Sequence, residues 1–212
     1  MPEVSGEIRL DGQDLGTFSP DEIARHIAYL PQSRSVPDIT VSGLALHGRF
    51  PSLRSPRRYR REDYDKAAEA LERVGLTALA HRNMTTLSGG HRQMAYLAMA
   101  LAQDTDVILM DEPTTFLDIR NQLELLDRAR ALAAEGKTVV VILHDFEAAL
   151  HYADHVVLLS EGRILKAGAA EEVLRSRELA EAFGITPGFY KGEDGLHVYV
   201  KGQRLDNPSD KR

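Results

Sequence analysis

The sequence predicts an α/β fold in which helices flank a mostly parallel β-sheet, with a small helical subdomain. In the second half of the chain, runs of aliphatic and β-branched residues alternate with helical patterns, which is typical of a parallel sheet covered on both faces. Apolar residues make up 43% of the 212 residues and charged residues 27%, as in an ordinary globular protein. No apolar run approaches the roughly 20 residues that a membrane-spanning helix needs.

The first 32 residues predict two strands and one helix. The segment Glu7 to Leu10 has the pattern of a strand, and Asp11-Gly12 that of the turn after it. Ser19 is a suitable N-cap for a helix that has Pro20 at its first position. The run from Ile27 to Gln32 then predicts a short strand that ends at a polar glutamine.

A small helical subdomain is predicted from about residue 38 to residue 86. Its main element is the segment Glu62 to Leu76, where apolar residues recur at helical spacing and Gly75 ends the helix. Five arginines lie between Arg54 and Arg61, next to several acidic residues. Because the net charge is −6, we interpret this run as a solvated face and expect no nucleic-acid partner.

Helices and strands alternate after residue 87. Ser88 caps a helix that is apolar almost all round and is therefore expected to be buried, and Asp118 caps an amphipathic helix that Gly136 ends. The remaining predictions are strands at 107–111, 138–143 and 155–160, a helix at 145–154, a hairpin extension at 161–168, a terminal helix at 170–183 and a C-terminal tail at 184–212 with one weak strand, 196–200.

The triplet Gly136-Lys137-Thr138 matches the end of the phosphate-binding pattern G-x-x-x-x-G-K-[ST]. A phosphate loop must follow a strand and open a helix, so that its amides and the helix N-terminus face the anion. Here the triplet closes a helix and opens a strand, and Ala131 stands where the first glycine is needed. The triplet therefore predicts a helix end and not a nucleotide site.

Two adjacent carboxylates, Asp111 and Glu112, follow the apolar run "VILM". Ligands of open α/β sheets bind at the carboxyl ends of strands, so Asp111 is a candidate Mg²⁺ ligand and Glu112 could polarise an attacking water. Upstream, "LSGGH" exposes backbone amides at a helix start, which favours anion binding. Downstream, His144 follows a strand and could donate a hydrogen bond to a phosphate oxygen.

Two other histidines, His151 and His155, have the spacing of helical zinc ligands. They lack the glutamate of the H-E-x-x-H motif. We interpret both histidines as structural.

Taken in order, these motifs resemble those of the ATP-binding subunits of ABC transporters. "AYLPQ" is similar to the Q-loop of that family, "LSGGHRQ" to its signature motif, "VILMDEP" to its Walker B strand, "TTFLD" to its D-loop and "VVVILHD" to its switch-histidine strand. The resemblance covers essentially all of residues 1–212, and five motifs in the correct order make it specific. It implies the fold of P-loop nucleotide triphosphatases.

The resemblance also implies residue roles in binding ATP and Mg²⁺. Glu112 would be the general base and His144 the γ-phosphate contact. The remaining implied roles are Asp111 as the Mg²⁺ ligand, Gln32 as a sensor of Mg²⁺ and water that couples to the membrane subunit, Ser88, Gly89 and Gly90 as ATP contacts across a dimer interface, and Asp118 as the connection between the two sites. His91 stands where the family usually has glutamine, and we expect it to tune the signature site without abolishing it.

Within the family, "ITVSGLALHGRFP" and the segment from "LAMALAQ" to "NQLELL" are most similar to importers of iron-siderophore, haem or cobalamin complexes. This resemblance implies a homodimer on two transmembrane permease subunits, at the cytoplasmic face of the plasma (inner) membrane. A periplasmic or lipoprotein substrate-binding protein would be an indirect partner. The absence of cysteine excludes disulfides and thiolate metal sites, and is compatible with a reducing cytoplasm.

The phosphate loop of the family is missing from the sequence, and we expect the first core strand and the loop's helix to be missing with it. Losing one preorganised donor can cost roughly 3 kcal/mol, so we expect no measurable hydrolysis by this chain alone. Two explanations are compatible with this: Met1 is an internal methionine of a working ATPase, or the chain is a remnant that offers its signature motif to an intact partner. The intact motifs elsewhere favour the first.

A DNA-repair or chromosome ATPase would share the signature motif. Those proteins need a long coiled-coil insertion between the Q-loop and the signature, and only 55 residues without sustained heptads lie between Gln32 and Ser88. The spacing therefore argues against this class.

Overall fold

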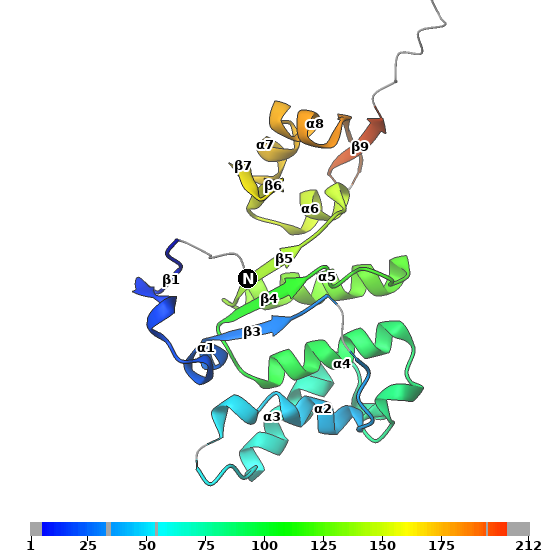
Figure 1. The fold of residues 1–212 in the computed structure, drawn as a ribbon. Coiled ribbons are helices and arrows are strands. Elements are labelled where there is room, and N and C mark those ends of the chain that lie inside the picture. Colours follow the sequence, from blue (N-terminus) through cyan, green and yellow to red (C-terminus); the bar gives the residue numbers. More distant parts are fainter. Residues whose placement is uncertain (1–5, 33–34, 54, 194, 203–212) are drawn as a thin grey trace, which may run out of the picture. The chain divides into compact units, whose positions relative to one another are not determined.

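The structure is a computed structural model that describes residues 6–32, 35–53, 55–193 and 195–202. The chain forms two compact units, divided between Ile142 and Leu143 (Figure 1). The parallel sheet with its helices lies in the first unit. The second unit consists of short helices and two antiparallel strand pairs.

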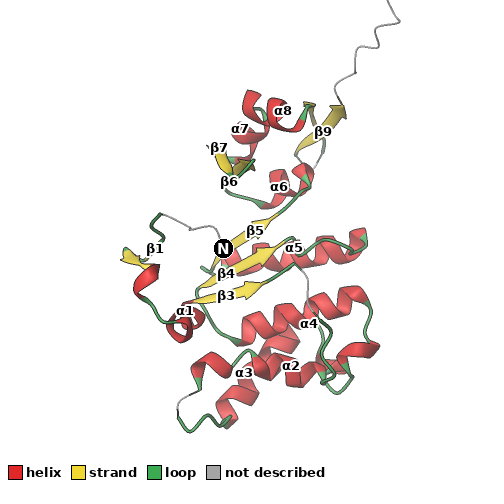
Figure 2. Ribbon diagram, in the orientation of Figure 1, coloured by secondary structure: helices red, strands yellow, loops and turns green. Residues whose placement is uncertain are grey.

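A three-stranded sheet organises the first unit. Its strands are β3 (Ile27–Leu30), β4 (Val107–Asp111) and β5 (Thr138–Ile142), in the order β3-β4-β5 and parallel throughout. Figure 2 shows the three arrows pointing the same way, with long helices beside them. The predicted α/β class and parallel sheet are confirmed in this unit.

The two faces of the sheet differ in burial. Alternate residues on one face belong to a buried core that also includes side chains of α4 (Gly89–Ala102) and α5 (Ile119–Ala134). These core-facing strand residues are Ala28, Leu30, Ile108, Met110, Val139 and Val141. On the opposite face Tyr29, Val140 and Ile142 are about half exposed. The prediction that both faces of the sheet are covered is therefore wrong for the described residues: one face is covered and the other is open.

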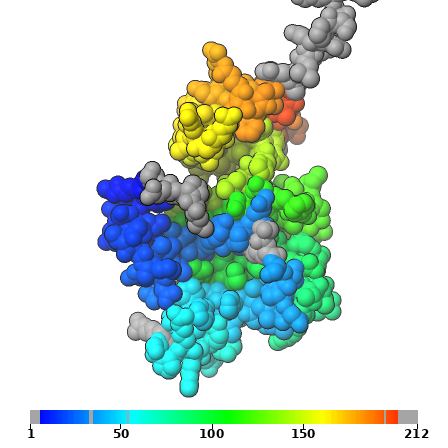
Figure 3. Space-filling view, in the orientation of Figure 1, coloured from blue at the N-terminus to red at the C-terminus, as the bar shows by residue number. Residues whose placement is uncertain are grey.

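The helical segment predicted at 38–86 contains only helices as regular elements. They are α2 (Val41–His47), η2 (Phe50–Ser52), α3 (Arg61–Arg73), η3 (Thr77–Leu79) and η4 (Met84–Thr86). Buried residues of α2 and α3 belong to the same core cluster as the sheet. In the space-filling view this segment forms a continuous surface with α4 (Figure 3). Its treatment as a separate subdomain stays an interpretation.

A buried ion pair lies inside this helical segment. Arg49 Nε donates a 3.1 Å hydrogen bond to Asp63 Oδ1, and both residues are less than 10% exposed. The Arg49 guanidinium also donates to the carbonyl of Ala102 at 2.9 Å, while the Arg60 amide donates to Asp63 Oδ2 at 2.8 Å. The pair thus ties the chain before α3 to the end of α4.

Residues 6–26 contain β1 (Arg9–Leu10), β2 (Gln13–Asp14), η1 (Leu15–Thr17) and α1 (Pro20–His26). Ser19 caps α1 as predicted, and it forms a capping box with Glu22, whose carboxylate accepts from the Ser19 amide at 2.7 Å. The predicted strand at Glu7–Leu10 is shorter than expected.

The second unit contains α6 (Phe146–Tyr152), β6 (Val156–Ser160), β7 (Arg163–Gly168), α7 (Ala170–Leu174), α8 (Arg177–Phe183), β8 (Ile185–Lys191) and β9 (Leu196–Gly202). β6 pairs with β7 and β8 with β9, both antiparallel. Leu158, Val173, Leu174 and Leu179 form its buried core.

Two predictions for the second unit were wrong. The expected single helix at 170–183 is divided, because Ser176 accepts the Leu179 amide and starts a new helix. Residues 184–212 were expected to hold one weak strand, but β8 precedes and pairs with it along seven residues. The remainder of that segment, from residue 203, lies outside the described residues.

No helix among the described residues has the length and apolar character that crossing a membrane requires.

Candidate functional site

The carboxyl ends of β3 and β4 bring Gln32 and Glu112 together. In the parallel register Leu30 lies opposite Met110, and Gln32 and Glu112 each follow their member of this pair by two residues. Gln32 Nε2 donates a 2.6 Å hydrogen bond to Glu112 Oε2. The pairing of parallel strands therefore turns a sequence separation of 80 residues into a direct contact.

Asp111 is the last residue of β4 and directly precedes Glu112. The Tyr29 hydroxyl donates to Asp111 Oδ2 at 3.1 Å, and the Thr115 hydroxyl donates to Glu112 Oε2 at 3.2 Å. Neither Tyr29 nor Thr115 was predicted as a site residue. Tyr29 could have been found from its place on the strand that leads to the Q-loop, on the opposite face from buried Ala28 and Leu30.

The backbone at Glu112 is unusual. Its φ angle is 44°, in the left-handed region that residues other than glycine rarely occupy. Such a conformation costs on the order of 1–2 kcal/mol for an L-residue. Strained residues of this kind cluster at functional sites, so the turn after β4 is consistent with a role that requires the Glu112 carboxylate in this position.

The side chains at this edge suit a hard cation. Asp111 offers carboxylate oxygens, and Gln32 keeps its amide oxygen as an acceptor because its nitrogen is the donor to Glu112. Mg²⁺ prefers such oxygen ligands and usually retains several waters. The donor set therefore fits Mg²⁺, and the ligand roles of Asp111 and Gln32 stay predictions.

The signature segment begins α4 as expected. Ser88 is the N-cap, and its Oγ accepts from the His91 amide at 3.3 Å. The His91 ring nitrogen Nδ1 lies 3.0 Å from the same hydroxyl. His91 is thus engaged with Ser88 within one turn of helix, which gives a physical basis for the expected tuning of this segment.

Gly89 and Gly90 have different surroundings. A Cβ at Gly89 would meet no atom within 4 Å, so an external group could approach this backbone closely. A Cβ at Gly90 would lie 2.4 Å from Asn121 Oδ1. The amide of a side chain in the first turn of α5 therefore occupies the space beside Gly90.

Asp118 holds that amide in place. Its Oδ1 accepts from the Asn121 backbone N–H at 2.9 Å and its Oδ2 from Asn121 Nδ2 at 2.7 Å. Asp118 is the N-cap of α5, as predicted. Through Asn121, the D-loop aspartate is packed against the signature helix. Asn121 was not predicted, although its place three residues after a capping aspartate is where a reciprocal partner is found.

His144 follows β5 by two residues, is exposed and belongs to the second unit. Its proposed contact with a γ-phosphate stays a prediction. The Gly136-Lys137-Thr138 triplet follows α5 and its Thr138 begins β5, as predicted, with Gly136 at a φ angle of 95°. The Lys137 ammonium donates to the Thr105 carbonyl at 2.7 Å. Lys137 therefore makes a structural contact with the segment before β4.

Comparison with known families gives a match to the model described as "ABC transporter" over residues 1–115. The ferric enterobactin transport ATP-binding protein FepC of Escherichia coli K12 is 40% identical over 187 residues, which are 87% of this chain and 69% of that protein. The petrobactin import ATP-binding protein FpuD of Bacillus anthracis is also 40% identical, over 86% of this chain and 68% of that protein.

Solved structures agree in fold. An inward-facing ABC transporter described as of metal-chelate type superposes with a TM-score of 0.77 and 29% identity, over 85% of this chain and 73% of that one. The ATP-binding cassette MJ1267 in its ADP conformation gives a TM-score of 0.75 at 24% identity, over 84% of this chain and 76% of that one.

Proposed function

The chain belongs to the ABC transporter family, and we propose from that premise that it is the ATP-binding subunit of an importer for iron-siderophore-type chelates. The observation that carries this proposal is the Gln32–Glu112 hydrogen bond beside Asp111, at the carboxyl edge of a parallel sheet. This is where open α/β sheets bind nucleotides.

At this edge Asp111 and Gln32 would hold Mg²⁺, and the ion would neutralise charge on the phosphates of ATP. Glu112 would accept a proton from the attacking water, as a general base. The hydrogen bonds from Gln32 and Thr115 to Oε2 of Glu112 orient its carboxylate. Gln32 therefore connects metal binding to the position of the base.

The signature segment would contact a nucleotide held by a second ATPase subunit. Ser88, Gly89, Gly90 and His91 lie at the start of a 14-residue helix, whose N-terminus favours an anion. The open surroundings of Gly89 suit close approach of a phosphate. Asp118 would connect this contact to the facing site, and His144 would contact the γ-phosphate.

The substrate class rests on the named relatives, which are ATP-binding proteins for ferric enterobactin transport and petrobactin import. We extend the class, an iron chelate, to this chain. The transmembrane partners would be two permease subunits, with a binding protein as an indirect partner, and the chain would lie at the cytoplasmic face of the inner membrane without crossing it.

The 212 residues contain no phosphate loop between a strand and a helix. We propose that this chain by itself does not turn over ATP. The alternative proposal is a subunit that offers only its signature motif to an intact partner. Translation of the DNA upstream of the Met1 codon separates the two, because an in-frame phosphate loop indicates an ATPase and a stop codon indicates the silent partner.

A mixing assay tests the signature directly. The chain is combined with a related ATPase whose own signature is disabled, and ATP hydrolysis is measured. Restored hydrolysis is expected, and Gly89→Gln should abolish it, since that side chain would block the phosphate while its Cβ has room beside Gly89. Ala131→Gln, which adds the same side chain on the exposed surface of α5, is the control. Hydrolysis by the chain alone would refute the requirement for the loop.

A further inference from the structure

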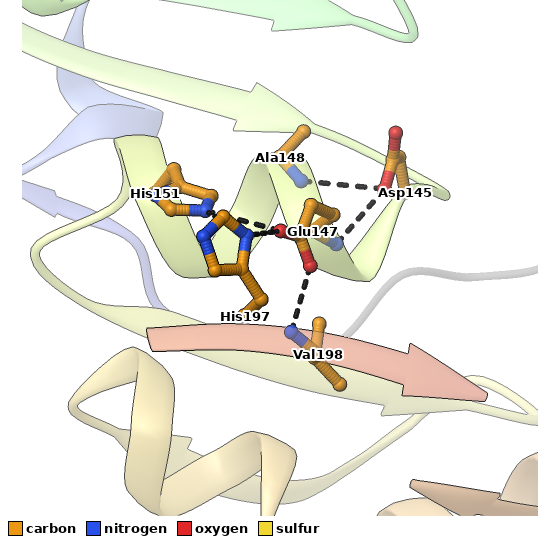
Figure 4. Close-up of polar contacts among 6 residues, drawn as sticks. All are labelled: Asp145, Glu147, Ala148, His151, His197 and Val198. Carbon is orange, nitrogen blue, oxygen red and sulfur yellow. Dashed lines mark hydrogen bonds and ion pairs between the residues drawn. The ribbon is translucent and has the colours of Figure 1, made fainter. Parts of the chain in front are cut away.

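Three potential metal ligands that have no role in the proposed nucleotide site meet in the second unit. Glu147 and His151 lie on α6, and His197 lies on β9 (Figure 4). Glu147 Oε1 is 3.1 Å from His151 Nε2 and 2.5 Å from His197 Nδ1, and the two ring nitrogens are 3.4 Å apart. One carboxylate oxygen and two imidazole nitrogens thus converge on one point.

We propose that Glu147, His151 and His197 form a binding site for a divalent transition-metal ion of the Zn²⁺ class. Two ligands at about 2.0–2.1 Å from a tetrahedral ion lie about 3.3 Å apart. The separations of 3.1 and 3.4 Å already match this spacing. The remaining pair, at 2.5 Å, is a hydrogen bond that must open by less than about 1 Å when the ion replaces the shared proton.

The arrangement is held in place by contacts outside the three ligand atoms. Val198 N–H donates to Glu147 Oε2 at 2.7 Å, which leaves Oε1 directed at the two histidines. The Tyr190 ring stacks on His197, with centroids 4.9 Å apart and planes 15° apart. Tyr190 and His197 are also direct partners in the β8–β9 register. Such outer contacts orient metal ligands and raise their affinity.

The spacing on α6 explains how two of the ligands share a face. Residues four apart lie one above the other on a helix, so Glu147 and His151 point the same way. Asp145 caps the helix by accepting from the Glu147 and Ala148 amides at 2.9 and 3.2 Å, which fixes its first turn. The interpretation of His151 as purely structural is therefore replaced by this proposal, and His155 is not part of the cluster.

The donor set selects the class of ion. Imidazole nitrogens suit Zn²⁺, Co²⁺, Ni²⁺ and Cu²⁺, whereas Mg²⁺ and Ca²⁺ require a larger set of oxygen ligands. Three protein ligands leave a fourth tetrahedral position for water. The side chains are 15–37% exposed, so an ion could reach them from solvent. A bound ion would join α6 to β9, and this would stabilise the second unit.

The test uses the untagged 212-residue chain after removal of metal with a chelator. Zn²⁺ binding is measured by competition with a chromophoric chelator, and Co²⁺ binding by its visible spectrum. We expect one Zn²⁺ per chain, an intense spectrum of tetrahedral Co²⁺, and slower hydrogen exchange at residues 146–152 and 196–202 when Zn²⁺ is present. A millimolar excess of Mg²⁺ should not displace Zn²⁺.

Two variants preserve the hydrogen bonds while removing the ligands. His151→Gln places an amide nitrogen near the position of Nε2, and His197→Asn places one near Nδ1, so both should fold as the wild type does. Each should weaken Zn²⁺ binding at least about tenfold. His155→Ala, which removes a histidine outside the cluster, should leave the affinity unchanged. Equal affinity in all four proteins, an octahedral Co²⁺ spectrum, or no saturable binding would each overturn the proposal.

Discussion

Gln32 and Glu112 lie 80 residues apart in the sequence and share a 2.6 Å hydrogen bond, from the glutamine amide to the glutamate carboxylate. Each residue stands two positions beyond a pair of directly opposed strand residues. A shift of the segment that carries Gln32 therefore moves the partner of the proposed base. This contact gives a physical route by which a change at the Q-loop would reach the chemistry.

The first prediction concerns this pair. It is tested in a chimera in which the strand, phosphate loop and helix of a related ATPase are fused upstream of this chain. Glu112→Gln should retain ATP binding and lower turnover at least about a hundredfold, because the general base is lost. Gln32→Leu should lower turnover less. In the double variant the losses should not add, since the two residues act through one hydrogen bond.

Steady-state ATP hydrolysis and equilibrium nucleotide binding measure these effects. Gln13→Leu, at an exposed position of β2, serves as the control for a glutamine-to-leucine change. Full turnover in Glu112→Gln would remove this residue from the base role.

The second prediction concerns the contact between the signature helix and α5. Gly90→Ala should lower the free energy of unfolding by about 2 kcal/mol, because its Cβ would overlap the Asn121 amide that Asp118 holds. Asn121→Ala combined with Gly90→Ala should recover part of that loss. Gly89→Ala, where the added Cβ meets no atom within 4 Å, is the matched control.

Denaturant unfolding of the wild type, Gly90→Ala, Asn121→Ala and the double variant gives the coupling energy between positions 90 and 121. Purely additive effects would mean that the overlap is relieved elsewhere in the chain.

The third prediction concerns the Arg49–Asp63 pair. Burial alone would raise the pKa of the Asp63 carboxyl, but the bonds from the Arg60 amide and the Arg49 guanidinium favour its charged form and lower the pKa below its ordinary value. Asp63→Asn should lower the free energy of unfolding by about 3 kcal/mol at neutral pH, since the buried Arg49 charge loses its partner.

A group whose pKa is lowered by folding stabilises the protein above its unfolded pKa and loses this contribution as the pH falls through the folded value. The difference between wild type and Asp63→Asn should therefore be constant near neutral pH and shrink below about pH 3.9. Urea unfolding at several pH values measures it. Asp21→Asn, which breaks the exposed pair with Arg57, should show no measurable loss at any pH.

The fourth prediction concerns the open face of the sheet. Val140 and Ile142 are 49% and 50% exposed there, on the same face as half-exposed Tyr29. Apolar surface of this kind promotes association. Replacing both residues with threonine should reduce concentration-dependent light scattering and preserve the strand, because threonine is also β-branched. Val139→Thr, on the core face, should instead destabilise the chain. Unchanged scattering in the double variant would place the association elsewhere.

Local signals predicted much of the first unit. The helices begin with the predicted N-caps Ser19, Ser88 and Asp118. A short polar side chain at this position accepts a hydrogen bond from a backbone N–H of the first turn, which has no partner within the helix. The contacts of Tyr29 and Asn121 were not foreseen, since each depends on which strands or helices become neighbours. In the second unit, β8 was not predicted because it contains Pro187 and Gly188, which are disfavoured in strands. Its pairing with β9 stabilises the strand despite these two residues.

The metal ligands show the same limit. The sequence singled out His151 and His155 because of their spacing. The histidine that contacts His151, which lies on helix α6, is His197, 46 residues later on strand β9. Glu147 has the i, i+4 relation to His151, but a lone Glu–His pair on a helix is usually an exposed ion pair. Only the packing of β9 against α6 makes the three residues a cluster.

The Asn121 side chain fills the space that a side chain at position 90 would need, and this has an evolutionary consequence. A side chain at position 90 becomes tolerable only after position 121 has become smaller, whereas a longer side chain at 121 requires that position 90 stay glycine. The order of substitutions is therefore constrained, and related sequences should show correlated changes at these two positions even where the neighbouring residues vary independently.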